Sequence, residues 1–157
     1  MTHDEELMQE AYNCGIEILE KYNFRSPRIK GLYCDNIIAL NCSIQTKKEK
    51  ACILAEELGH YYTSYGDILD QSAVNNRKQE YRARLWAYNK LIGLTGIIRA
   101  YEYGCHNLYS MADHLDVTEE FLHDAIKYYR GKYGEYTTLD NYIIYFEPHL
   151  GVFKLIQ

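Results

Sequence analysis

Residues 54–62 read LAEELGHYY, and this stretch decides both the fold class and the kind of site that the chain is predicted to carry. In metallopeptidase helices of the His-Glu-x-x-His type, two metal ligands four residues apart lie on one face of the helix. The glutamate after the first ligand acts as general base. Here Glu56 occupies the first ligand position, Glu57 the general-base position and His60 the second ligand position. Glutamate also ligates zinc, so the spacing predicts a metal site in which a carboxylate replaces one imidazole.

A catalytic metal site needs a third protein ligand, which a neighbouring helix is expected to supply. Glu80 is the candidate, because it opens a basic and apolar stretch about twenty residues after His60. A second register stays open, in which Glu57 ligates and Glu56 is the base, although the four-residue spacing favours the first. The alternative without a metal treats these side chains as solvated helix charges. The apolar residues before Glu56 favour the metal, because a buried unpaired carboxylate is costly.

Apolar spacing on either side of this stretch predicts a mixture of helices and strands. Helical spacing covers residues 4–22, 46–65 and 78–92. Strand-like runs cover residues 28–33, 37–44, 141–146 and 152–156, the last two as a closing hairpin. The breaks between helices fall at Gly66, at a connector over residues 68–76, and at Gly93 and Gly96. The expected class is α+β, with a mostly helical body beside a small antiparallel sheet.

Residues 108–130 predict two helices joined by a turn, with Thr118 as the N-cap of the second. From residue 106 to 130, five Asp and Glu outnumber two Lys and Arg, which leaves a net charge of −3. A DNA-reading helix carries donors and basic groups where this one carries Glu119 and Glu120, so phosphate would repel it. We therefore expect a packing or protein-docking segment, and hypothesise that its acidic face docks a basic repressor.

The 157-residue chain has 17 Lys and Arg against 22 Asp and Glu, a net charge of −5 and a pI near 5.7. This balance argues against a dedicated nucleic-acid-binding protein. Its five cysteines include no Cys-x-x-Cys pair, and unpaired thiols fit a reducing compartment. The start is acidic and lacks the pattern of a signal peptide, and no apolar run is long enough to cross a bilayer. The chain is therefore expected to be cytoplasmic and to have no membrane partner.

Two stretches, LAEELGHY at residues 54–61 and RKQEYRARLWA at residues 77–87, resemble the ImmA/IrrE family of zinc metallopeptidase-like proteins. Members of this family are often encoded by prophages and integrative elements. The resemblance covers roughly residues 5–92, and the tail is similar to the phage-type branch of the family. It implies a zincin-like metallopeptidase domain over residues 1–92. A helix-turn-helix-like segment and the C-terminal hairpin, residues 93–157, would follow and pack with it as one unit.

The resemblance also implies a function and a set of site residues. A metal would be held by Glu56, His60 and Glu80, with Glu57 as the base that takes a proton from water and passes it to the leaving amine. The sequence departs from the family at Glu56, where the family's usual motif has histidine. Zinc is the expected metal, and the additional carboxylate leaves manganese and iron as alternatives.

The implied activity is that of an endopeptidase which cleaves or inactivates a helix-turn-helix repressor of a prophage or mobile element. Two other functions stay open. One is a non-catalytic regulator of the same fold that antagonises a repressor by binding to it. The other is a DNA-binding regulator, against which the acidic second helix argues.

Overall fold

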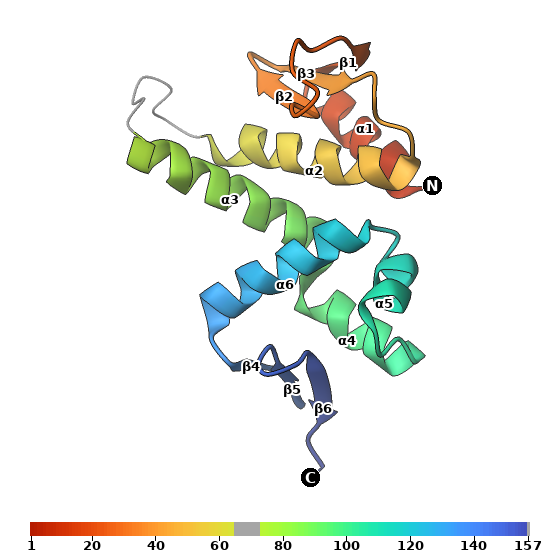
Figure 1. The fold of residues 1–157 in the computed structure, drawn as a ribbon, viewed down its shortest axis with the longest axis vertical. Helices are drawn as coiled ribbons and strands as arrows, with labels where there is room; N and C mark the ends of the chain where they lie inside the picture. Colours follow the sequence, from red (N-terminus) through yellow and green to blue (C-terminus); the bar gives the residue numbers. More distant parts are fainter. Residues whose placement is uncertain (65–72, 157) are drawn as a thin grey trace. The chain divides into compact units, whose positions relative to one another are not determined.

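The computed structural model describes residues 1–64 and 73–156 of the chain (Figure 1). The chain divides into two compact units, Met1–Ala87 and Tyr88–Gln157, and each is described by itself. The predicted helix end at Gly66 and most of the predicted connector over 68–76 lie outside the described residues. The last part of that connector was wrongly predicted, because the next helix already begins at Ala73. The predicted division into residues 1–92 and 93–157 stays a prediction.

The first unit begins with helix α1, His3–Asn13, which is much shorter than the predicted helix over residues 4–22. The chain leaves the helix at Gly15, whose φ of 75° is left-handed, and then forms strand β1, Glu17–Tyr22. Glycine adopts this conformation without the steric cost that a Cβ would bring. The apolar residues Ile16 and Leu19 fitted a helical spacing, but they belong to the strand and its approach.

Strands β2, Gly31–Cys34, and β3, Ile37–Asn41, form the predicted pair of strands, joined by a tight turn. The two turn residues, Asp35 and Asn36, both have positive φ, as the turns favoured in hairpins require. The sheet order is β1-β3-β2, with β3 parallel to β1 and antiparallel to β2. The predicted antiparallel pair is therefore confirmed, and β1 adds a parallel partner that was not predicted, because its segment was expected to be helical.

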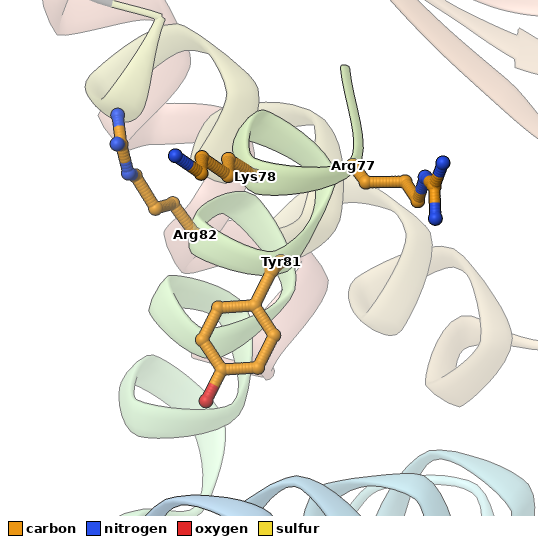
Figure 2. A pocket seen from close by; sticks show the side chains of 4 residues that line it. All are labelled: Arg77, Lys78, Tyr81 and Arg82. Carbon is orange, nitrogen blue, oxygen red and sulfur yellow. The ribbon is translucent and has the colours of Figure 1, made fainter. Parts of the chain in front are cut away.

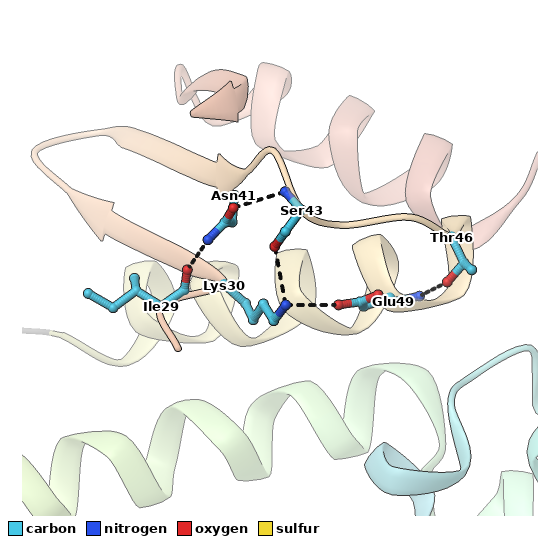
Figure 3. A network of polar contacts seen from close by, with 6 residues as sticks. All are labelled: Ile29, Lys30, Asn41, Ser43, Thr46 and Glu49. Atoms are coloured by element: carbon cyan, nitrogen blue, oxygen red, sulfur yellow. Dashed lines mark hydrogen bonds and ion pairs between the residues drawn. The ribbon is translucent and has the colours of Figure 1, made fainter. Parts of the chain in front are cut away.

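A chain of polar contacts fixes the passage from β3 into helix α2, Lys47–Thr63 (Figure 3). The side chain of Asn41 accepts a hydrogen bond from the Ser43 amide at 2.9 Å, and the Lys30 ammonium donates to the Ser43 hydroxyl at 3.2 Å. The Thr46 hydroxyl accepts from the Glu49 amide at 3.1 Å and so caps the first turn of α2. The start of α2 is thereby set relative to the sheet that it covers.

Helix α2 and helix α3, Ala73–Leu91, confirm the predicted helices over 46–65 and 78–92 within a few residues. In Figure 1, α2 lies between the sheet of the first unit and the first part of α3. The two helices meet at Gly59, where a Cβ on this residue would lie 2.2 Å from the carbonyl oxygen of Ala83, so only glycine allows this approach. The buried core of this unit includes Leu7, Ala11, Ile38, Leu40, Leu54, Ala55 and Leu58.

The second unit begins with the last residues of α3 and continues into a helix that was not predicted, α4, Gly93–Tyr103. Gly93 has a φ of 66°, so it does break the preceding helix, but the chain turns there and becomes helical again at once. Helices α5, Leu108–Leu115, and α6, Glu119–Tyr133, occupy the region where two helices were predicted. The Thr118 hydroxyl accepts a hydrogen bond from the Phe121 amide at 3.1 Å, which confirms the predicted N-cap.

Three strands close the chain: β4, Tyr136–Leu139, β5, Tyr142–Tyr145, and β6, Gly151–Lys154. They form an antiparallel sheet in the order β4-β5-β6, so the predicted hairpin is confirmed and β4 is an additional strand. The core of this unit includes Tyr88, Ile97, Met111, Leu122, Tyr129, Ile144 and Phe146. The chain is thus an α+β protein. Within the described residues, every helix is too short or too polar to span a bilayer.

Candidate metal centre

The close approach of α2 and α3 at Gly59 brings two of the predicted metal ligands together. The Nε2 atom of His60, on α2, lies 2.9 Å from the Oε2 atom of Glu80, on α3. The other carboxylate oxygen of Glu80 accepts from the Nε atom of Arg84 at 2.8 Å, one turn further along α3. The side chains of His60 and Glu80 are 26% and 43% exposed, so solvent reaches both. Each oxygen of the Glu80 carboxylate therefore has a partner within the protein.

The electrostatics of this pair agree with its geometry. The hydrogen bond to Glu80 is the main cause that raises the pKa of His60, and the same bond is the main cause that lowers the pKa of Glu80 to about 2. The nearby Arg84 adds to the lowering at Glu80. Both shifts favour an imidazolium paired with a carboxylate. Because both groups are partly exposed, we expect the pair to contribute little to folding stability.

Glu57, the predicted general base, lies partly buried against strand β2. A Cβ built on Gly31 would lie 3.2 Å from the Cγ atom of Glu57, so the strand backbone passes close to this side chain. Burial is the main cause that raises the pKa of Glu57 to about 7, and the negative charges of Glu56 and Glu80 act in the same direction. His60 and a hydrogen bond from the Tyr33 backbone oppose the rise. A carboxyl with this pKa can both take up and release a proton near neutral pH.

The four predicted residues fit a metal in donor type, since one imidazole and several carboxylates suit zinc, manganese or iron. The structure brings together fewer of these ligands than the sequence predicted. Within the described residues, no group of three or more His, Cys, Asp or Glu side chains is placed so that it could hold a metal ion. Glu56 is partly buried one turn before His60, while His60 and Glu80 contact each other directly. A metal would have to replace the His60–Glu80 hydrogen bond.

Three residues that the sequence reading did not assign to the site shape it: Arg84, which holds Glu80, and Gly31 and Tyr33, which face Glu57 from strand β2. The spacing of four residues between Glu80 and Arg84 on one helix was a signal for the first. The role of β2 had no comparable signal, because it depends on how the sheet lies on α2.

Tyr62, which adjoins the motif, has a packing role and not a place in the site. Its hydroxyl donates to Glu10 at 3.1 Å and contacts the Cys14 sulfur at 3.2 Å, and its ring stacks on Trp86 at 4.8 Å between centroids. Burial raises the pKa of Tyr62. The neighbouring Tyr61 makes edge-to-face ring contacts with Tyr33 and Tyr62.

Basic residues line a shallow pocket on α3, next to Glu80 in the sequence. Its lining residues are Arg77, Lys78, Tyr81 and Arg82, around a volume of about 300 Å³. Figure 2 shows Lys78 and Arg82 extending together on one side of the helix, while Arg77 extends on the other. The positive charges of this surface lie on the same helix as Glu80 and would attract acidic groups to α3.

Comparison with known proteins identifies the family of the chain. No curated protein and no solved structure matches it. The sequence model of the Peptidase_M78 family, described as an IrrE N-terminal-like domain, matches residues 13–127. This match includes the α2 motif, Glu80 and Arg84, and it extends well beyond the first unit into α6. Because the match covers most of its length, the chain belongs to the Peptidase_M78 family of IrrE N-terminal-like proteins.

Proposed function

We propose that this protein is a metal-dependent endopeptidase. The observation that carries the proposal is the partly buried carboxyl of Glu57, whose pKa lies near neutrality, beside the His60–Glu80 pair in a member of a peptidase family. A general base works best when its pKa is close to the pH at which the enzyme operates. Folding alone does not favour such a group, because burying a carboxylate costs free energy.

In the proposed site, Glu56, His60 and Glu80 hold the metal, which is zinc in the simplest case. A divalent cation bound there supplies a Lewis acid for the peptide carbonyl and makes water more acidic. Glu57 takes a proton from the attacking water and delivers it to the leaving amine. Arg84 keeps the Glu80 carboxylate oriented towards His60, with which it is already in contact.

The carboxylate at Glu56 changes the charge of the proposed site. Two carboxylates and one imidazole bring the first coordination shell of a dication close to neutral, whereas two imidazoles and one carboxylate leave a net positive charge. The weaker positive charge reduces the Lewis-acid effect, so we propose a slow peptidase that acts on a substrate held against it. The same donor set would also accept manganese or iron.

The proposed substrate is a helix-turn-helix repressor encoded by the same prophage or mobile element, in the cytoplasm. The family resemblance supports this choice. The zincin-like fold of the first unit and the helix-turn-helix-like character of α5 and α6 are part of the same proposal. The net negative charge of residues 106–130 supports protein docking over DNA binding by these helices.

A second function, antagonism of a repressor by binding alone, is favoured by one specific observation. Both oxygens of the Glu80 carboxylate are engaged, one by His60 and one by Arg84, so the pair is electrostatically satisfied without a cation. Such a protein would keep the fold and the acidic surface of α5 and α6 that is proposed to dock a repressor, and it would act without hydrolysing a peptide bond.

Metal content is the measurement that separates these functions. Untagged protein, gently purified, would be analysed by plasma mass spectrometry beside Glu80→Ala and beside Glu17→Ala, which removes an exposed carboxylate of the same unit. We expect near-stoichiometric zinc in the parent chain and in Glu17→Ala, and its loss in Glu80→Ala. If the parent chain takes up neither zinc, manganese nor iron and still relieves repression, the binding function replaces the peptidase.

A further inference from the structure

The second unit contains a pocket of about 500 Å³ that the candidate metal centre does not involve. Its walls include three aromatic rings, those of Tyr101 at the end of α4, Tyr145 on β5 and Phe153 on β6. Ile143 on β5 and the loop between β5 and β6 complete the lining, and the loop contributes the side chain of Glu147. Aromatic faces together with a carboxylate are a combination that binds organic cations.

The strand pairing of the sheet positions the rings. Tyr145 pairs with Gly151 in the register of β5 and β6, and the ring of Phe153 meets that of Tyr145 edge to face, at 5.6 Å between centroids. A Cβ at Gly151 would lie 3.3 Å from the Phe153 ring, so glycine leaves room for this arrangement. Phe153 is nevertheless 57% exposed. The ring of Phe153 is therefore accessible to a ligand in the pocket.

Glu147 supplies the negative charge. Its Oε1 atom lies 3.7 Å from the Nε atom of Arg130, and both side chains are nearly half exposed. A charge-assisted hydrogen bond is usually about 2.7–2.9 Å long, so this ion pair is loose. A cation that enters the pocket can therefore form a closer contact with the same carboxylate.

The unit already uses aromatic faces to hold ammonium groups. The Nζ atom of Lys132 lies 5.3 Å from the centroid of the Tyr133 ring, and that of Lys154 lies 5.8 Å from the centroid of the Tyr142 ring. Over residues 88–157, nine Asp and Glu face six Lys and Arg, so the field of this unit attracts positive partners.

The adjoining strand indicates what kind of molecule brings the cation. Strand β6 forms one edge of the sheet and lines the pocket with Gly151 and Phe153. An edge strand offers backbone groups to an added extended segment, and neighbouring pockets then select its side chains. We propose that this pocket binds the side chain of an arginine or lysine in a polypeptide partner laid along β6.

The test uses the full chain, labelled with nitrogen-15, and a capped peptide of sequence Val-Thr-Arg-Thr-Val. Matched peptides carry citrulline, which has nearly the same shape without the charge, or norleucine in place of arginine. We expect saturable shifts of the Gly151–Lys154 amides with the arginine peptide, and binding about tenfold weaker with the citrulline peptide. Phe153→Leu and Glu147→Gln should each weaken arginine binding by about the same factor.

Two controls change comparable side chains elsewhere in the unit. Tyr109→Leu removes an exposed ring from α5, and Glu135→Gln removes an exposed carboxyl just before β4; neither should alter binding. The amide spectrum of each variant reports whether it is folded. Three results would overturn the proposal: no saturable shift, equal binding of the arginine and citrulline peptides, or tightest binding of the norleucine peptide, which would identify an apolar docking site instead.

Discussion

Helices α2 and α6 begin in the same way and differ in where they place their carboxylates. Each starts at a threonine, Thr46 or Thr118, whose hydroxyl accepts from the backbone amide three residues later. On α6, Glu119 and Glu120 lie in the exposed first turn, where the helix dipole favours negative charge. On α2, Glu57 lies in the middle of the helix and is partly buried, and its pKa is raised to about 7.

The difference separates carboxylates that help a helix to fold from a carboxylate that opposes folding. Local stabilisation accounts for the acidic start of α6, so this acidity alone does not indicate a site. No such local stabilisation explains Glu57. Burial favours its neutral form, and the negative charges of Glu56 and Glu80 add to the free-energy cost of ionising it. The mid-helix carboxyl is therefore the stronger indication of function, and the two helices should respond oppositely to the loss of charge.

The largest expected effect is on catalysis. Glu57→Gln removes the proposed base with almost no change in shape, so cleavage of the repressor should fall by about 10²–10⁴-fold. Glu49→Gln, in the first turn of the same helix, is the matched control and should cleave normally. Circular dichroism would check that both variants are folded, and cleavage would be followed by mass spectrometry. Undiminished cleavage by Glu57→Gln would remove Glu57 from the mechanism.

A smaller change is expected at the neighbouring position. Glu56→His gives the proposed metal site one negative charge fewer, so the rate of peptide cleavage should rise by about tenfold through a stronger Lewis-acid effect. The measurement is the cleavage rate normalised to bound metal. If metal remains bound and the rate does not rise, the carboxylate at this position does not limit activity.

In the metal-free protein, we expect the free energy of unfolding to report directly the cost of burying the ionised Glu57 carboxylate. The pKa of Glu57 is raised from 4.5 to about 7 in the folded chain, so its stabilising contribution is complete below pH 4.5 and is lost as the pH rises through 7. Glu57→Gln should therefore be more stable than the parent by about 1–2 kcal/mol near pH 8, with little difference near pH 4. Urea unfolding of chelator-treated protein at both pH values measures this. A variant that is less stable near pH 8 would show that burial does not penalise the Glu57 carboxylate.

The smallest effects belong to α6, and they have the opposite sign. Thr118→Ala should lower the free energy of unfolding by about 1 kcal/mol through loss of the cap, and Glu120→Gln by about 0.3–1 kcal/mol through loss of a favourable charge. Thermal unfolding at low salt provides the comparison. If Glu120→Gln stabilised the protein, the negative charge in the first turn of α6 would be unfavourable, as that of Glu57 is. The two helices would then not differ in how their carboxylates affect folding.

Some elements of the fold could be predicted from the sequence because the residues that determine them lie within a few positions of one another. The two helices that carry the site, the cap at Thr118, and the strands β2, β3, β5 and β6 are all set by short-range spacing and turn chemistry. The errors have different causes. Strand β1 is stabilised by pairing with the distant strand β3, whereas the unpredicted strand β4 pairs locally with β5, and α4 begins at Gly93, a residue that suggested a break.

The sequence by itself determined the residue types and spacing of the candidate site, because side chains three and four residues apart share a helix face whatever the rest of the chain does. It also determined the charge of α5 and α6. The tertiary structure decided which of these groups meet. The approach of α3 to Gly59 brings Glu80 to His60, and strand β2 lies against the partly buried Glu57. Such contacts join segments far apart in the chain, so their energies depend on packing that no local pattern encodes.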